Sequence, residues 1–156
     1  MSIDTAAADI DSLLETLEAV FAGEHDLIAN AANMAALLFQ TLPEVNWAGF
    51  YLLQGDELVL GPFQGRVACV RIPLGRGVCG TAAERRETIV VPDVHEFPGH
   101  IACDAASRSE IVVPLIRAGR LVGVLDIDSP VPNRFSDADR TLCEAAAALL
   151  IRSLDT

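Results

Sequence analysis

The chain of 156 residues has the size of one ordinary domain, large enough to bury a core without disulfides or a structural metal. Its formal net charge is −11. Nucleic acid is therefore excluded as an expected partner, because phosphate binding requires a basic surface. The chain contains no lysine, which excludes Schiff-base catalysis and a phosphate-loop lysine.

The N-terminal residues do not resemble a signal peptide, because they lack a basic segment and are acidic from the start. The longest apolar run, residues 145–151, is far shorter than the roughly 18 residues that a membrane-spanning helix needs. We therefore expect a cytoplasmic protein without a membrane partner. Thiols stay reduced in that compartment, so the four cysteines predict catalysis or burial rather than a disulfide framework. The cysteine spacing does not predict a metal site.

Apolar residues at helical spacing predict two N-terminal helices, over residues 8–21 and 25–40. The pattern then changes to extended segments, and residues 47–53 and 57–61 are typical of a hairpin. The rest of the chain predicts a short helix over 78–86, a final helix from the N-cap Ser136 through Leu154, and strands over 68–72, 88–91, 111–117 and 121–127.

The last two strands flank Ala118-Gly119-Arg120, a connection of hairpin length, and should pair antiparallel. Because repeated βαβ units are missing from this order, it predicts an α+β fold with helices packed on a central antiparallel sheet. We expect one domain over residues 1–156, with N-terminal helices over about 8–40, the sheet and site over about 46–128 and a C-terminal helix over about 136–154.

Residues 92–109 form an unusually long predicted loop, and loops of this length are generally functional or disordered. Cys103 lies at its centre, where reactivity explains a cysteine better than burial does. Burial fits Cys143 best, because that residue lies in the apolar final helix. Cys69 is expected on a strand, and Cys79 at the start of the short helix.

Residues 75–80, Gly-Arg-Gly-Val-Cys-Gly, match the GxGxxG pattern of dinucleotide-binding proteins. Such a site also requires a parallel βαβ unit and an acidic residue about twenty positions on. The flanking strands are predicted to be antiparallel, and no clean acidic candidate follows. We therefore interpret the segment as a tight turn that opens a helix.

Strand alternation places Asp126 and Asp128 on one face, together with Val122 and Val124. Two carboxylates at a strand end can line a pocket, where repulsion and partial burial raise a pKa and favour proton donation. A solvated strand end explains them equally well. Glu110 precedes an apolar run, and its default interpretation is an exposed glutamate at the start of a strand.

Trp47 and Tyr51, the only Trp and Tyr of the chain, share one face of their predicted strand with Gly49 between them. They could wall an apolar pocket around the small hole left by the glycine, although aromatic core packing is the more frequent explanation. His100 lies three residues before Cys103 and could favour its thiolate, although a solvated loop histidine is more common.

Five motifs carry a family resemblance, namely NWAGFYLL at 46–53, GPFQG at 61–65, RIPLGRGVCGTA at 71–82, HIACDAASRSEIVVPL at 100–115 and GVLDIDSP at 123–130. Together they resemble the free methionine-(R)-sulfoxide reductases, a family of GAF domain proteins. The resemblance covers nearly the whole chain from about Asn46, and it implies a single GAF-type domain with a long active-site loop.

The resemblance implies that Cys103 attacks the sulfur of free methionine sulfoxide and becomes a sulfenic acid, while a pocket carboxylic acid protonates the oxygen. Cys69 would then form a disulfide with Cys103, and a thioredoxin-type reductant would reduce it, without metal or organic cofactor. Cys79 matches a third cysteine of auxiliary role, and the sequence leaves open which of the two resolves first. The implied substrate-binding residues are Trp47, Tyr51, Glu110, Asp126 and Asp128.

Two other functions compete with this reductase. One is a GAF sensor that binds a small ligand without chemistry, although such modules usually regulate an attached output domain, which we do not expect here. The other is a thiol redox sensor that only switches between oxidation states of Cys69 and Cys103. The oligomeric state stays open, and a homodimer is compatible with the sequence.

Overall fold

The structure is a computed structural model that describes residues 10–100 and 106–155. Six strands form one antiparallel sheet in the order β3-β2-β1-β6-β5-β4. The strands are β1 (Trp47–Gln54), β2 (Glu57–Gly65), β3 (Arg71–Pro73), β4 (Ile89–Val91), β5 (Ser109–Arg117) and β6 (Arg120–Ser129). The helices are α2 (Leu13–Phe21), α3 (Leu27–Thr41), α4 (Gly77–Arg85), α5 (Asp137–Ser153) and the 3₁₀ turn η1 (Val94–Glu96).

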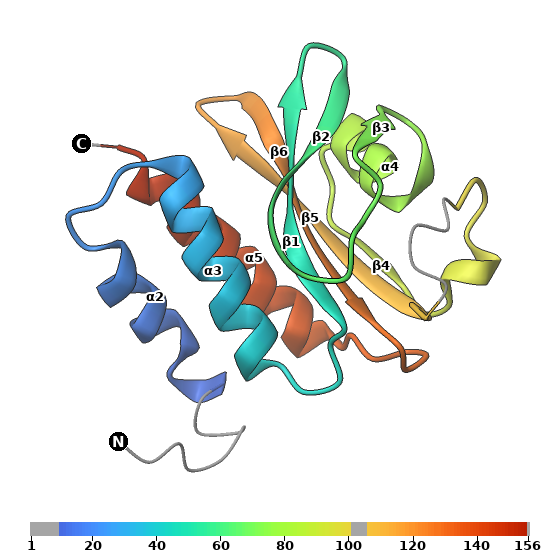
Figure 1. Cartoon of the computed structure of the whole chain (residues 1–156), viewed down its shortest axis with the longest axis horizontal. Helices are drawn as coiled ribbons and strands as arrows, with labels where there is room; N and C mark the ends of the chain where they lie inside the picture. The colour runs from blue at the N-terminus through green and yellow to red at the C-terminus, as the bar shows by residue number, and fades with distance from the viewer. Residues whose placement is uncertain (1–9, 101–105, 156) are drawn as a thin grey trace.

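The sheet separates two apolar layers (Figure 1). Helices α2, α3 and α5 cover one face, where they bury residues such as Phe50 and Leu125. Helix α4 and its neighbouring loops cover the other face, which buries Tyr51, Val112 and Val124. Neighbouring residues along one strand therefore enter different layers, as the alternation of a pleated strand requires. The predicted α+β fold with N- and C-terminal helices on an antiparallel sheet is confirmed.

Two local predictions are confirmed in detail. Ser136 is the N-cap of α5, and its side chain and that of Asp139 form a reciprocal capping box. The β5–β6 hairpin turns through Ala118 and Gly119, which have φ values of 51° and 78°. Two positive φ values at the centre of a two-residue turn match the twist of the paired strands, which fixes the register of this hairpin.

The predicted strand over 68–72 is wrong for most of its length, because β3 covers only Arg71–Pro73. The preceding residues 66–70 form a loop, and Cys69 lies on this loop rather than on a strand. A backbone hydrogen bond joins the loop to β2, from the Leu60 N–H to the Val70 carbonyl at 2.8 Å. The prediction failed because it took the apolar residues of this segment to be buried, whereas Val70 is largely exposed.

Helix α4 connects β3 with β4, and these strands lie at opposite edges of the sheet. The connection that contains α4 therefore spans one face of the sheet, and the N-terminus of α4 lines a pocket together with residues of β1, β5 and β6. This is not a parallel βαβ unit, so the rejection of a dinucleotide site at residues 75–80 is supported. Within the described ranges, no helix is both long and apolar enough to cross a membrane.

Candidate active site

A row of three side chains runs across β1, β6 and β5. Trp47 is paired with Asp128, and Asp128 is paired on its other side with Glu110. Asp126 lies two residues before Asp128 and shares its face. Together with Cys79 of α4, these residues line one pocket. The sheet register therefore brings together acidic residues that lie far apart in the sequence.

Two of the acidic residues are buried, with Glu110 only 7 % and Asp126 only 5 % exposed, and Asp128 is half-buried. The default interpretation of Glu110 as an exposed residue at a strand start is wrong, because β5 begins at Ser109, two residues before the predicted start, and the Glu110 side chain is buried. Burial, followed by the charges of Asp126 and Asp128, raises the pKa of Glu110 well above its ordinary range. Burial also raises the pKa of Asp126.

Glu110 is paired across the strands with Asp128, and its carboxylate lies close to Asp126, with one oxygen of each within 4.8 Å of the other. An ionised carboxylate is only an acceptor, so hydrogen bonds among these groups require a proton on one of them. The raised pKa values of Glu110 and Asp126 therefore favour a proton within this group of carboxyls. Of the two interpretations of Asp126 and Asp128, the pocket wall is the one that the geometry supports.

Cys79 lies in the first turn of α4, with its Sγ 3.9 Å from Glu110 Oε2. Burial, and then the neighbouring charges of Asp126 and Glu110, raise the pKa of the Cys79 thiol well above its ordinary range. The surroundings thus favour a protonated thiol, which can donate a weak hydrogen bond to the carboxyl group. A neutral thiol is a poor nucleophile, because the thiolate is the reactive form.

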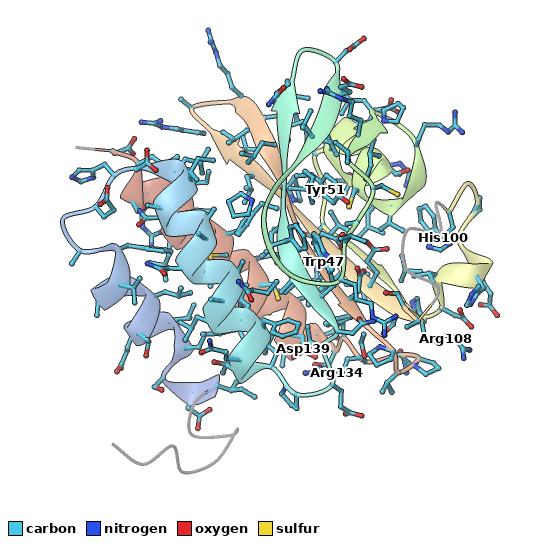
Figure 2. The ribbon with its side chains drawn as sticks, viewed as in Figure 1. Trp47, Tyr51, His100, Arg108, Arg134 and Asp139 are labelled. Carbon is cyan, nitrogen blue, oxygen red and sulfur yellow. The ribbon has the colours of Figure 1, made fainter. Side chains whose placement is uncertain are left out.

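Trp47 and Tyr51 form an aromatic wall of the same pocket, with ring centroids 6.0 Å apart (Figure 2). Phe63 of β2 stacks on Trp47 with a centroid distance of 5.2 Å. The expected hole beside Gly49 does not exist, because the Cβ of Phe63 occupies the space where a side chain on residue 49 would lie. Trp47 and Tyr51 therefore belong to the hydrophobic core and also line the pocket.

The same two aromatic side chains also bind the backbone of the loop that carries Cys69. The Trp47 Nε1–H donates to the Arg66 carbonyl at 3.0 Å, and the Tyr51 hydroxyl donates to the Cys69 carbonyl at 2.9 Å. Ala68 of this loop lines the pocket. This connection was not predicted from the sequence, because a side-chain bond to a distant backbone carbonyl leaves no signal in local spacing.

Cys103 lies outside the described residues, and so do its predicted interactions. The described parts of its loop are bound at their base, where the Val94 N–H donates to the Arg108 carbonyl at 2.7 Å and Arg108 pairs with Asp93 at 3.3 Å. His100 and Ser107, which flank residues 101–105, both line the pocket.

Partial burial, and then the neighbouring His95, lower the pKa of His100. The ring is consequently disposed to be neutral at physiological pH, which weakens its expected role in stabilising a thiolate. Figure 2 shows His100 beside the sheet, on the same side as the aromatic wall.

Residues at the N-terminus of α4 line the pocket together with the acidic residues, and Cys79 of its first turn contacts Glu110. The N-cap Arg76 provides no side-chain cap, and the first N–H groups of a helix have no acceptor within it. This end of the pocket therefore offers N–H donors and positive potential.

The prediction that Cys143 is a buried structural residue is confirmed, because it is fully buried in the other layer, where burial raises the pKa of Cys143 to about 12.

Residues 24–154 match the GAF domain family. The free methionine-R-sulfoxide reductase of Escherichia coli (strain K12) is 56% identical over 88% of this chain and 84% of its own length. The enzyme of that name from Saccharomyces cerevisiae is 43% identical over 92% of this chain and 84% of its own. The crystal structure of free methionine-R-sulfoxide reductase from Neisseria meningitidis in complex with its substrate superposes with a TM-score of 0.90. It has 47% identity and covers 99% of this chain and 92% of its own.

The chain therefore belongs to the GAF domain family, and within that family to the group that contains the free methionine-R-sulfoxide reductases. The family resemblance noted in the sequence motifs is confirmed. The similarity extends over nearly the whole of each relative, so it concerns the complete fold and not a shared fragment.

Proposed function

We propose that this protein reduces free L-methionine (R)-sulfoxide to methionine. The observation that carries the proposal is a small pocket whose wall holds the carboxyl groups of Glu110, Asp126 and Asp128, next to loops that bear cysteines. The names of the relatives and the substrate complex of a similar structure support the same assignment.

The charge distribution of the pocket suits a free amino acid. Glu110, Asp126 and Asp128 offer acceptors to an ammonium group, and the uncapped N-terminus of α4 offers N–H donors to a carboxylate. A methionine within a peptide has neither terminal charge, so it would leave buried polar groups unpaired. Trp47 and Tyr51 provide apolar surface for the methionine side chain.

In the first half-reaction, the Cys103 thiolate attacks the sulfoxide sulfur while the proton shared by the carboxyl trio passes to the sulfoxide oxygen. The hydroxyl is transferred to the cysteine sulfur, so Cys103 becomes a sulfenic acid and methionine leaves. The cysteine sulfur loses two electrons and the substrate sulfur gains them. A carboxyl group whose pKa is raised by burial is suited to hold this proton near neutral pH.

In the second half-reaction, the Cys69 thiol attacks the sulfenic acid, which forms a Cys69–Cys103 disulfide and releases water. A dithiol of the thioredoxin type then reduces this disulfide by exchange. We assign the resolving role to Cys69 rather than Cys79, because burial and the neighbouring carboxyls, which raise the pKa of the Cys79 thiol, keep it protonated. We further propose that the protein is a homodimer in the cytoplasm. Light scattering of the purified protein tests the oligomeric state.

Coupled oxidation of NADPH through thioredoxin and its reductase tests the proposal directly. We expect turnover with free methionine (R)-sulfoxide and little with the (S) epimer or the N-acetylated (R)-sulfoxide, which lacks the ammonium group. Absence of turnover with the free (R)-sulfoxide would overturn the assignment and favour a ligand or redox sensor. A Cys103→Ser variant should lose more than about 10³-fold in kcat, as expected when the nucleophile is removed.

A further inference from the structure

We propose that Cys79, Glu110 and Asp126 form a binding site for a thiophilic divalent cation of the zinc class. One ligand atom from each, the thiol sulfur and two carboxylate oxygens, lie within 4.8 Å of one another. The three residues come from α4, β5 and β6, so the packing of the helix on the sheet holds the donors together. This cation plays no part in the reaction proposed above.

The donor set matches the preference of zinc, which binds cysteine sulfur at about 2.3 Å and carboxylate oxygen at about 2.0–2.2 Å in tetrahedral geometry. The ligands of such a tetrahedron lie roughly 3.5 Å apart, and the Cys79 Sγ and Glu110 Oε2 are already 3.9 Å apart. The fourth position would face the pocket, where it is open to water.

An independent observation points to a positively charged occupant. Asp126 is only 5 % exposed, and its Oδ1 has no hydrogen-bond partner within the part of the chain that the structure describes. A buried acceptor without a donor destabilises the fold unless something binds it. The atom belongs to a residue that lines the pocket, so a ligand can reach it.

The charges also favour a cation. Binding of the metal ion would release the thiol proton of Cys79 and the proton shared by the carboxyls to solvent. Two positive charges would then compensate one thiolate and two carboxylates that lie close together in a buried site. The N-terminus of α4 would further stabilise the thiolate, because Cys79 lies in its first turn.

The cation would occupy the position that the proposed function assigns to the substrate ammonium group, so the two should compete. Only this consequence rests on the proposed function. Metal binding itself requires the three side chains and does not depend on turnover. The site would make the protein sensitive to free zinc through a cysteine outside the proposed Cys69–Cys103 pair.

Cobalt(II) replaces zinc as a spectroscopic probe in the test, and the full-length Cys69→Ser/Cys103→Ser variant leaves only Cys79 and Cys143 as thiols. We expect one equivalent of cobalt to produce thiolate-to-cobalt charge-transfer absorption and the intense visible bands of a four-coordinate ion. The bands should disappear when Cys79→Ser is added and remain when Cys143→Ala is added. Absence of these bands, or bands that persist without Cys79, would overturn the proposal.

A second variant tests the same site if Cys79→Ser fails to fold. Asp126→Asn in the same background keeps the thiol and should weaken cobalt binding by at least about tenfold, because one charged ligand is lost. An unchanged affinity would contradict the assigned ligand set. A separate competition measurement adds methionine, which should raise the apparent Kd for cobalt. If cobalt binds through Cys79 and methionine has no effect, the metal site stands and the proposed amino acid site fails.

Discussion

The Tyr51 hydroxyl donates a hydrogen bond to the Cys69 carbonyl at 2.9 Å, so a side chain of the pocket wall holds the loop that carries the proposed resolving cysteine. Trp47 binds the same loop three residues earlier, at the Arg66 carbonyl. The wall of the candidate pocket and the position of Cys69 are therefore connected through these two hydrogen bonds. This connection separates the two half-reactions experimentally, because it should influence the second more than the first.

Tyr51→Phe removes the bond to the Cys69 loop and keeps the aromatic ring. We expect thioredoxin-coupled turnover to slow by about fivefold, the factor that corresponds to one hydrogen bond of about 1 kcal/mol. Methionine release in a single turnover without reductant should change less than about twofold. Phe63→Leu is the matched control, because Phe63 stacks on Trp47 and makes no hydrogen bond to the loop. Equal slowing of both measurements in Tyr51→Phe would contradict the separation.

Glu110→Gln removes a carboxyl from the trio that holds the proton. We expect kcat to fall by about 10²–10⁴-fold, the usual contribution of a general acid. In the wild type, activity that needs the protonated trio should decrease as the pH rises through the raised pKa, and this alkaline limb should be lost in the variant. Glu18→Gln, an exposed change on α2, should leave the pH profile unaltered. A normal profile in Glu110→Gln would assign the proton to another group.

The same variant should change how stability depends on pH. The folded-state pKa of Glu110 lies well above its ordinary value of 4.5, so the folded state binds more protons than the unfolded state between these two values. The free energy of unfolding therefore falls as the pH rises above about 4.5. Thermal unfolding between pH 5 and 8 should show a shallower decrease of Tm for Glu110→Gln than for the wild type. An equal slope in both proteins would be inconsistent with a raised pKa at this position.

Asp93→Asn tests whether the base of the long loop positions its reactive residue. Asp93 accepts a hydrogen bond from the His95 N–H and pairs with Arg108, and these contacts lower its pKa, so the ion pair persists at neutral pH and is lost on acidification. The amide keeps an acceptor for His95 and loses the charge. We expect a several-fold lower kcat with little change in Tm. Glu96→Gln, an exposed change on the same 3₁₀ turn, is the control and should leave kcat unaltered. A normal kcat in Asp93→Asn would exclude a positioning role.

Ser136→Ala tests the capping box of α5, which lies on the face of the sheet opposite the pocket. The loss of an N-cap costs about 1 kcal/mol of stability, and for a chain of this size that lowers Tm by roughly 2–4 °C. Turnover at 25 °C should stay unchanged, because the cap contacts no pocket residue. Ser136→Asp keeps a capping side chain and should restore most of the Tm. A loss of activity in Ser136→Ala would indicate that α5 influences the site.

Local signals were sufficient for most of the fold. The capping residue Ser136, the hairpin turn at Ala118-Gly119 and the alternation of β6 each depend on neighbours within a few positions, so the sequence determined them by itself. The same alternation is enough to predict that Asp126 and Asp128 share one face. The strand predicted around Cys69 failed because apolar letters were taken to indicate a buried strand, whereas aromatic side chains of β1 hold this segment as a loop.

Only the tertiary structure decided which residues meet. Glu110 had the sequence context of an ordinary strand start, and the β5–β6 register placed it opposite Asp128 and buried it. Cys79 was one cysteine among four, and the passage of α4 across the sheet brought its sulfur to the Glu110 carboxyl. The physical reason is that a pKa depends on burial and on charges within a few ångströms. Residues 110 and 126 come within that distance only when β5 pairs with β6, and residue 79 joins them only when α4 packs on the sheet.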